Sequence, residues 1–335
     1  MKILEIATNA PPYKGGVSRL VGILYEGLIS RGHEVQVLIP RTKFKELSFS
    51  SIPFRHYNDY DVIHLHGPTP FLSDLTLITN GKHPIVYTHH CEPSWISEKV
   101  SKIYRFLHRF LVRRAKAIVV HSNDYARLFR EKKVYVIRMP CKFKPINVNF
   151  SQKPDVFTVL FVGQFRPYKG VDVLLKAASA LKDVNFILTG EGWLKPKYSA
   201  LVKAQNLSNV KILNEVDDSK LMDLYRRAHV ICLPSVNTSE AYGLCLLEGA
   251  LFGCLPLASN LPGVRENVSN LKGLLIEPQS TISLIKTIRM LSSDKEKWAA
   301  LAKSSQNAAY KYVSLYTPEY YIKKHEEVFK NAVNI

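Results

Sequence analysis

The chain builds the same strand, loop and helix start twice. "PYKG" occurs at 12–15, in "MKILEIATNAPPYKGGVSRLVGIL", and again at 167–170, in "FTVLFVGQFRPYKGVDVLLKA". Each copy follows a short apolar run and precedes a segment whose apolar residues recur with helical period. Strands and helices then alternate in both halves, which is typical of a parallel α/β sheet. Because such sheets bind ligands beyond the carboxyl ends of their strands, near helix N-termini, both loops are candidate binding sites.

The chain length of 335 residues exceeds what one hydrophobic core usually supports. Composition changes over 138–154, a polar stretch with three prolines and no helical period, which we interpret as a linker. We therefore predict two Rossmann-like doubly wound parallel-sheet domains, over 1–145 and 150–312, that face a central cleft. A C-terminal helix over 318–333 is expected to cross back onto the first domain.

The net charge of +18 bears on the partners of the protein rather than on its fold. Nucleic acid, an anionic membrane surface and phosphorylated substrates are all candidates. No RRM, zinc-finger or helix-turn-helix signature occurs, so we predict no nucleic-acid partner and keep a basic nucleic-acid-binding protein as the alternative. The five cysteines are scattered without a CxxC pair, no signal peptide opens the chain and no apolar run reaches 18 residues. We expect a cytoplasmic protein, in a reducing compartment.

Both repeated loops carry features that suit a phosphate. Gly15 and Gly16 would let the backbone approach an anion closely, although a plain turn has the same composition. Arg166 and Lys169 directly precede a helix N-terminus, an arrangement that suits a diphosphate, although two solvated surface cations would look the same. Neither loop is a GxGxxG or GxxxxGK[ST] motif, so a standard dinucleotide enzyme and a P-loop ATPase are excluded.

Two glutamates eight residues apart, Glu240 and Glu248, flank the start of a predicted helix in "SEAYGLCLLEGALFG". A carboxylate at Glu240, close to the positive helix end, stays ionised readily and can accept hydrogen bonds from hydroxyls. Glu248 lies in an apolar stretch, where a buried carboxylate costs several kcal/mol unless a hydroxyl or cation meets it. A structural ion pair is the alternative to a ligand site.

Several motifs, taken together in their order along the chain, resemble those of the retaining nucleotide-sugar glycosyltransferases of family 4, which have the GT-B fold. The resemblance rests on "EAYGLCLLE", which matches the family's E-x7-E signature, and on "PPYKGGV", "YTHHCE", "FVGQFRPYKGVDVLL" and "LPGVREN". It implies transfer of a sugar from a UDP- or GDP-sugar, with retention and without a metal or other cofactor. It places the donor on the second domain, and a lipid-linked or oligosaccharide acceptor on the first.

The resemblance also implies roles for individual residues. Glu240 and His90 would act beside the transferred sugar, Glu248 would hold the donor ribose, and Lys169 would bind the diphosphate. The other donor-binding positions would be Gly15, Gly16, Gly163, Glu215, Val216, Tyr242, Gly243 and Leu244. The family usually has Arg where this chain has Gln164, and we expect Arg166 to supply the missing guanidinium as a further catalytic cation.

Other readings of the chain remain open. A catalytically inactive regulatory protein of the same fold is one alternative, and sucrose or glycogen synthases and phosphorylases are others that the chain length disfavours. Asp59-Tyr60-Asp61 is a DxD pattern, but it precedes a strand, and we interpret it as a loop. His64 and His66, with His90 and Cys91, could ligate zinc; we instead expect them to line a polar cleft and predict no metal.

The basic stretch 99–117 is a second strong signal. Its cations occupy one sector of a helical wheel, opposite an apolar side, and they are Lys102, Arg105, Arg109, Arg113 and Lys116. Such a helix could lie on anionic lipid headgroups, which suggests a peripheral membrane protein, or could pack on its own sheet with a solvated basic face. In either case we expect the apolar side to pack inward and the basic side to face outward.

Overall fold

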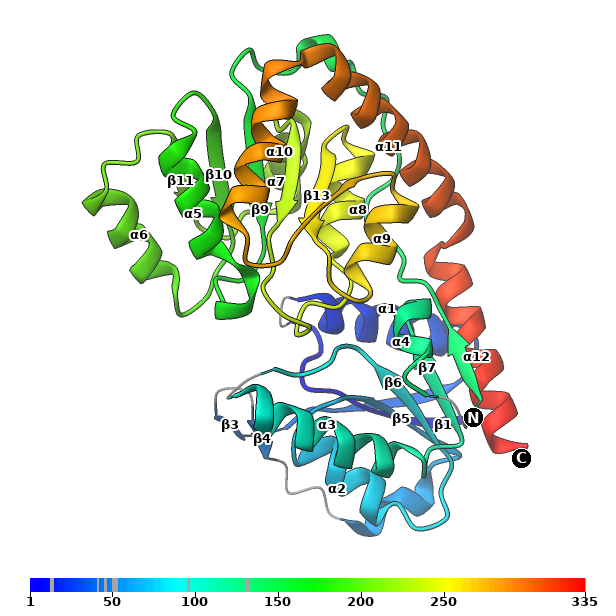
Figure 1. Cartoon of the computed structure of the whole chain (residues 1–335). Helices are drawn as coiled ribbons and strands as arrows, with labels where there is room; N and C mark the ends of the chain where they lie inside the picture. The colour runs from blue at the N-terminus through cyan, green and yellow to red at the C-terminus, as the bar shows by residue number, and fades with distance from the viewer. Residues whose placement is uncertain are drawn as a thin grey trace. The chain divides into compact units, whose positions relative to one another are not determined.

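The computed structural model describes residues 1–12, 15–40, 42–44, 47–49, 54–94, 97–129 and 133–334. Tyr13 and Lys14, in the first "PYKG" copy, lie outside the described residues. The chain forms two compact units, one of Met1–Pro140 with Tyr316–Ile335 and one of Cys141–Leu315. Each unit holds one six-stranded parallel sheet flanked by helices (Figure 1), so the predicted pair of Rossmann-like domains is confirmed.

The first unit is built on a sheet with the strand order β2-β1-β5-β6-β7-β8. Its strands are β1 (Lys2–Ile6), β2 (Glu34–Leu38), β5 (Val62–Gly67), β6 (Ile85–His89), β7 (Ala117–Val120) and β8 (Val134–Val136). Its helices are α1 (Gly16–Ser30), α2 (Leu72–Thr79), α3 (Glu98–Val112), α4 (Asn123–Ala126) and α12 (Pro318–Val333), with a 3-10 turn at Phe54–Asp59. A separate antiparallel hairpin, β3 (Thr42–Phe44) and β4 (Leu47–Phe49), has no counterpart in the sequence prediction.

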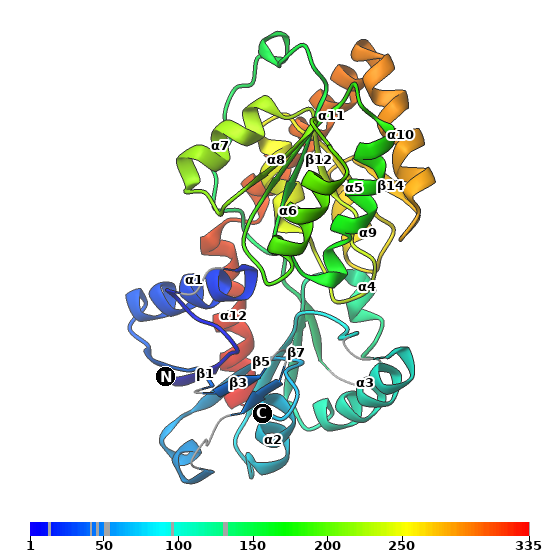
Figure 2. The same ribbon diagram turned by 90° about the vertical axis from the view of Figure 1, so that its left-hand side faces the viewer.

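The last helix, α12, belongs to the first unit although it ends the chain, and it packs beside α1 (Figures 1 and 2). Close approach requires Gly27 in α1, because a Cβ at that position would lie 2.2 Å from Ile322 Cδ1. At the edge of the contact, Arg31 forms ion pairs with Glu319 and Glu326. Thr317 caps α12, since its side chain accepts a hydrogen bond from the N–H of Tyr320, and Pro318 follows as the first helical residue.

The second unit is built on a sheet with the strand order β11-β10-β9-β12-β13-β14. Its strands are β9 (Thr158–Val162), β10 (Asn185–Thr189), β11 (Val210–Leu213), β12 (Val230–Leu233), β13 (Leu255–Ser259) and β14 (Leu274–Ile276). Its helices are α5 (Val171–Ala180), α6 (Lys195–Ala204), α7 (Asp218–Arg227), α8 (Leu244–Leu251), α9 (Val264–Asn270), α10 (Thr281–Ser293) and α11 (Lys295–Leu315). Short 3-10 turns cover Phe150–Gln152 and Pro167–Lys169.

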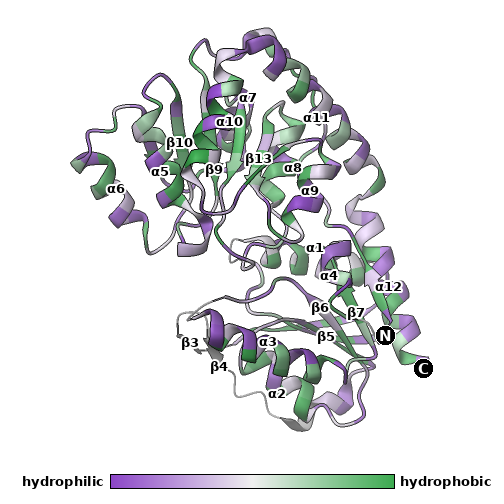
Figure 3. Ribbon diagram, viewed as in Figure 1, coloured by the Kyte–Doolittle hydropathy of each residue, from purple (hydrophilic) through white to green (hydrophobic). Residues whose placement is uncertain are grey.

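The central strands of both sheets are covered on both faces, which explains the continuous apolar sequences of strands such as β7 and β12 (Figure 3). Every residue of β5, β7, β12 and β13 is buried. In the first sheet β2 lies on one side of β1 and the later strands lie on the other, so the strand order reverses between β1 and β5. In the second sheet it reverses in the same way between β9 and β12. Open parallel sheets bind ligands at these reversal points, beyond the carboxyl ends of the strands.

The boundary between the units falls after Pro140, within the predicted linker, so the linker residues from Cys141 on belong to the second unit. Lys153 shows why, because its side chain is buried and its ammonium donates to three backbone carbonyls. The acceptors are Tyr225, Ala228 and Phe252, at 3.3, 2.5 and 3.3 Å, next to the C-terminal ends of α7 and α8. A cation at the negative ends of two helices is stabilising, so this polar stretch is anchored to the second unit.

Candidate active site

The second sheet brings the two most informative sequence segments together at its reversal point. β9 leads into the loop that carries "GQFRPYKG", and β12 leads into the loop that carries "PSVNTSEAYG". Because β9 and β12 are neighbouring parallel strands, both loops leave the same edge of the sheet. The two predicted loops of the second unit, which carry Lys169 and Glu240, therefore lie at one place in this sheet.

The "PYKG" turn after β9 is fitted closely onto the loop after β12. Gly170 has φ +70°, and a Cβ there would lie 1.9 Å from the carbonyl oxygen of Pro234, so only glycine is accommodated. The carbonyl of Tyr168 accepts a hydrogen bond of 2.8 Å from the N–H of Val236. This contact aims the side chain of Lys169 at the loop that carries Glu240.

Lys169 and Glu240 form a buried ion pair. The Nζ atom of Lys169 lies 2.5 Å from Oε2 of Glu240, and the side chains are 13% and 9% exposed. Burial alone would lower the pKa of Lys169, but the neighbouring Glu240 carboxylate outweighs it and raises the pKa above its usual range. The hydroxyl of Ser235 donates a longer bond of 3.4 Å to the same carboxylate oxygen. The ion pair that sequence analysis kept as an alternative is thus present at Glu240.

Glu248 meets a hydroxyl, as a buried carboxylate at that position requires. It lies in α8, is 4% exposed, and accepts a hydrogen bond of 2.9 Å from the hydroxyl of Tyr225. Burial first, and then the Glu248 charge, raises the pKa of Tyr225 well above its usual value, so the phenol remains a donor. Burial also raises the pKa of Cys245 to about 12; the Lys169 charge opposes this rise, and the charges of Glu240 and Glu248 add to it.

The start of α8 is held by residues that sequence analysis missed. The side-chain amide of Asn267 in α9 donates to the carbonyls of Tyr242 and Gly243, at 2.9 and 3.3 Å. The Tyr242 hydroxyl is hydrogen-bonded to the hydroxyl of Tyr312 in α11. Together these contacts fix the backbone that leads into Leu244, the first residue of the helix. An Asn in "GVREN" was the available signal, but the sequence alone does not say which backbone it would hold.

The remaining predicted donor residues lie along the same edge of the second sheet. Gly163 follows β9, and a Cβ there would lie 3.7 Å from Nζ of Lys169. Glu215 and Val216 follow β11, where the N–H of Glu215 donates to the carboxylate of Glu191 at 3.1 Å. Gln164 is exposed and Arg166 is half-buried at the start of the 3-10 turn. The replacement of the family arginine by Arg166 stays a prediction.

In the first unit, the predicted residues lie beyond β1 and β6. Gly15 and Gly16 are exposed at the start of α1, and among the described residues no atom beyond the chain neighbours of Gly15 lies within 4 Å of a Cβ placed on it. His90 directly follows β6 and is half-buried, with its Nε2 atom 2.9 Å from Nδ1 of His66. These residues occupy the carboxyl edge of the first sheet.

The histidines considered as zinc ligands are bonded differently from that hypothesis. His64 and His66 both lie within 2.9 Å of the carboxylate of Glu5, a residue that sequence analysis did not select. These three are the group of described residues whose donor atoms are close enough for a metal ion, and Cys91 is not part of it. Hydrogen bonds already account for all three side chains.

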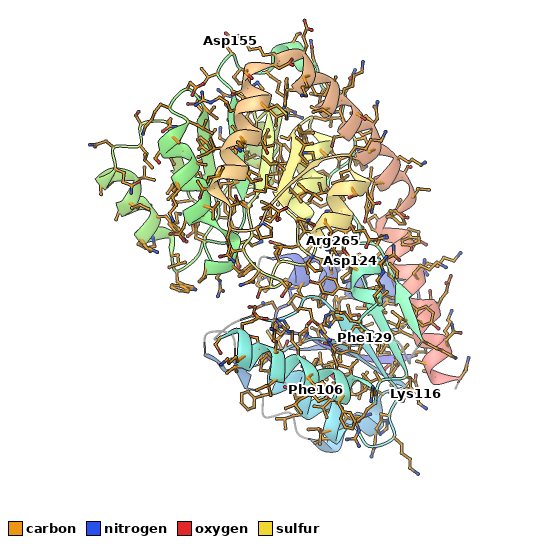
Figure 4. All side chains as sticks on the ribbon, in the orientation of Figure 1. Phe106, Lys116, Asp124, Phe129, Asp155 and Arg265 are labelled. Atoms are coloured by element: carbon orange, nitrogen blue, oxygen red, sulfur yellow. The ribbon has the colours of Figure 1, made fainter. Side chains whose placement is uncertain are left out.

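The predicted orientation of the basic helix is wrong. Ser101, His108 and Val112 form the buried face of α3, whereas its large apolar side chains point outward. These are Val100 (48% exposed), Ile103 (62%), Phe106 (74%), Leu107 (56%) and Phe110 (63%). Figure 4 labels Phe106 on α3 and Lys116 beyond the C-terminal end of this helix.

Polar contacts select this buried face of α3. Nδ1 of His108 lies 2.6 Å from Asp74, and its Nε2 lies 2.8 Å from the hydroxyl of Tyr87. Glu92 accepts from Arg109 at 2.5 Å and lies 3.4 Å from Nε of Arg105. Arg105, only 13% exposed, is therefore a structural cation, while Lys102, Arg113 and Lys116 remain exposed.

Two protein-family models match the chain. The model described as "Glycosyltransferase Family 4" matches residues 47–139, and the one described as "Glycosyl transferases group 1" matches 144–308. Together they span most of both units. A D-rhamnosyltransferase, WbpZ, of Pseudomonas aeruginosa is 28% identical over 306 residues, 85% of this chain and 78% of that protein. The O-antigen chain mannosyltransferase C of Escherichia coli is 26% identical over 337 residues, covering 88% of this chain and 90% of the relative.

Solved structures show the same fold. A sucrose-phosphate synthase from Thermosynechococcus elongatus has a TM-score of 0.77 at 18% identity over 98% of each chain. Anabaena HepE in complex with UDP-glucose has a TM-score of 0.70 at 19% identity, covering 98% of this chain and 100% of HepE. From the family matches and this fold, we conclude that the chain belongs to the family-4-type glycosyltransferases of the GT-B class.

Proposed function

We propose that this glycosyltransferase moves a sugar from a nucleoside-diphosphate sugar to a lipid-linked or glycan acceptor, with retention at the anomeric carbon and without a metal ion. The buried pair of Lys169 and Glu240 at the reversal point of the second sheet carries the proposal. A cation there can neutralise a departing diphosphate, and a carboxylate can accept hydrogen bonds from sugar hydroxyls. Relatives named for the O-antigen chain and for phosphatidyl-myo-inositol support this acceptor class.

In the proposed reaction, the bond between the anomeric carbon and the diphosphate oxygen breaks. A new bond forms from that carbon to the acceptor hydroxyl on the same face, and the hydroxyl proton passes to the leaving phosphate oxygen. Lys169, with Arg166 and the backbone N–H groups at the start of α8, stabilises the charge that develops on the phosphate. We assign Glu240 and His90 to the transferred sugar, and Gly15 and Gly16 to the phosphate.

The nucleoside is assigned to the rest of the second unit. Glu248, held by the Tyr225 hydroxyl, accepts hydrogen bonds from the ribose, and the backbone at Glu215 and Val216 contacts the base. The solved HepE complexes contain UDP or UDP-glucose, which makes uridine the first base to test. The first unit, whose sheet edge carries the histidines, is assigned to the acceptor.

The donor assignment is tested by thermal melting with UDP, GDP, ADP and their sugars, each with and without EDTA. A bound ligand should raise the melting temperature by mass action, and EDTA should not change the shift. Glu248→Gln should weaken nucleotide binding, whereas Glu296→Gln, an equal charge change on the exposed surface of α11, should not. If no nucleotide raises the melting temperature, the donor-site assignment is refuted.

The stereochemistry and the catalytic state need a separate measurement. Proton NMR of the first-formed product should show the anomeric configuration of the donor, and an inverted product would refute retention. Nucleotide binding without transfer to any lipid-linked or glycan acceptor would favour the inactive regulatory alternative. Loss of transfer with EDTA would refute metal independence.

We also propose that α2 and α3 attach the protein to a membrane surface. Among the described residues, sixteen large apolar side chains are exposed, and eight of them lie on or beside these two adjoining helices. Besides the five on α3, they are Phe71, Leu75 and Ile78. The exposed cations Lys102, Arg113 and Lys116 would meet anionic headgroups. In the part of the chain that the structure describes, no helix combines the length and apolarity that spanning a bilayer requires.

A further inference from the structure

A buried carboxylate lies under the carboxyl edge of the first sheet, in contact with two histidines. Glu5 in β1 and His64 and His66 in β5 are each at most 1% exposed. Nδ1 of His64 lies 2.9 Å from both carboxylate oxygens, and Nε2 of His66 lies 2.8 Å from one of them. The sequence motifs give no role to Glu5.

The chemistry of these groups allows one arrangement of protons. An ionised carboxylate only accepts hydrogen bonds, so Nε2 of His66 must carry a hydrogen. In a neutral ring, Nδ1 of His66 is then a bare acceptor, and the Nε2 atom of His90, 2.9 Å away, must donate to it. The rings of His66 and His90 are nearly parallel, at 7°, with centroids 5.1 Å apart. His90 is left with a lone pair on Nδ1.

The electrostatic environment supports this arrangement. Burial would raise the pKa of Glu5, but the two histidines outweigh it and hold that pKa well below its usual range. Burial, followed by the charges of His66 and His121, lowers the pKa of His90 well below the ordinary value. Burial also lowers the pKa of His66. These shifts favour an ionised Glu5 carboxylate and neutral rings at His66 and His90.

The hydrogen-bonded path from Glu5 through His66 to His90 ends in a buried acceptor. Nδ1 of His90 has no hydrogen-bond partner among the described residues, and neither has Nε2 of His121. The other nitrogen of His121 donates to the carbonyl of Ile137 at 2.9 Å, so its Nε2 also carries a lone pair. The two rings lie 5.2 Å apart between centroids. Buried acceptors without donors are unfavourable, and a ligand hydroxyl is a donor that would satisfy them.

We propose that Glu5, acting through His66, is a positioning residue that fixes the tautomer and ring orientation of His90, so that Nδ1 accepts a hydrogen bond from a substrate hydroxyl. The contact with substrate rests on the proposed function, whereas the tautomers do not. His64 forms a side branch, because the hydroxyl of Thr88 donates to its Nε2 at 2.7 Å and the branch ends there. Replacing Thr88 should therefore leave the path to His90 intact.

A metal ion held by Glu5, His64 and His66 is the competing explanation. A ligating nitrogen carries no hydrogen, so His66 would then be protonated on Nδ1 and would donate to His90. The two explanations thus require opposite tautomers of both rings. Two-bond proton–nitrogen NMR spectra of the full chain, labelled with 15N-histidine, distinguish them without any substrate.

We expect hydrogen on Nε2 of both His66 and His90, and no stoichiometric metal by elemental analysis. Hydrogen on Nδ1 of His66, or one bound metal ion per chain, would overturn the proposal. These results do not depend on catalysis. If NMR finds the expected tautomers but the wild-type chain transfers no sugar, the proposed function is refuted. The hydrogen-bond arrangement of Glu5, His66 and His90 is then still supported.

The positioning role is tested by paired variants at His66. His66→Gln keeps an acceptor for His90, whereas His66→Phe keeps a stacked ring without one. We expect kcat to fall about 10- to 100-fold in His66→Phe and in Glu5→Gln, which is the usual effect of losing an orienting partner. The kcat of His66→Gln should lie between those of His66→Phe and the wild type. Nucleotide affinity, which the proposed function assigns mainly to the second unit, should change less than twofold, and Thr88→Val should keep wild-type kcat. Equal activity of the Gln and Phe variants, in folded protein, would refute the role.

Discussion

The exposed apolar side chains of α3 allow the proposed membrane attachment to be tested quantitatively. Complete burial of a Phe side chain is worth about 1.5–3 kcal/mol. Phe106 and Phe110 are 74% and 63% exposed, so each still has about 1–2 kcal/mol to gain on entering an apolar phase. Replacing both with Ser should weaken partitioning by about 2–4 kcal/mol, or about 30-fold to several hundred-fold.

The assay is sedimentation with vesicles of phosphatidylcholine and phosphatidylglycerol, from which a partition coefficient is measured. Neither side chain packs in the core, so the double variant should keep the wild-type melting temperature. Ile282→Ser is the matched control, because Ile282 is 67% exposed but lies on α10 in the second unit. It should sediment like the wild type.

Salt separates insertion from purely electrostatic adsorption. Lys102→Ser should remove about 1 kcal/mol of binding at low salt and little at high salt, since headgroup attraction is screened. The Phe106 and Phe110 losses should persist at both salt concentrations. If the double variant binds like the wild type, or if Ile282→Ser loses as much, insertion of this face is refuted.

Two further predictions concern stability. Lys169→Met or Glu240→Gln alone should lower the free energy of unfolding by about 3 kcal/mol or more, because each leaves a buried partner unpaired. The double variant should lose clearly less than the sum of the two single losses. Additive losses, measured by urea denaturation, would show that the two residues do not interact. Hydrogen bonding from Lys330, opposed by burial and aided by Arg31, lowers the pKa of Glu326 to about 2. Its stabilising contribution should therefore be complete above the unfolded pKa, near 4.3, and disappear as pH falls toward 2. Glu326→Gln should flatten this part of the stability-versus-pH curve, and an unchanged curve would contradict the assignment.

The sequence predicts the fold well because its signals are local and repeated. The apolar period of α1, the strand-forming runs and Pro318 at the start of α12 each act within a few residues. The strand order and the contact of α12 with α1 follow from the way such elements pack. The hairpin β3–β4 is short and lacks a strong turn motif, which explains why it was not predicted.

Side-chain partners distant in sequence are where prediction fails. A helical wheel correctly separates the apolar and basic sides of α3, but it cannot show that Asp74 and Glu92 hold His108 and Arg109. These polar contacts turn the apolar side outward. Glu5 was missed for the same reason, because "KILEIAT" gives no sign that its carboxylate lies beside two histidines of another strand.

The resting pair of Lys169 and Glu240 changes what donor binding must accomplish. A diphosphate alone would draw the Lys169 ammonium toward its own charge and leave a buried carboxylate without its cation. A complete nucleotide sugar offers both replacements, since its phosphate meets the cation while its sugar hydroxyls meet Glu240. In the proposed reaction, negative charge grows on the diphosphate as it leaves, so Lys169 would stabilise the transition state more than the bound donor. On this argument, a buried ion pair between Lys169 and Glu240 is compatible with the proposed donor site.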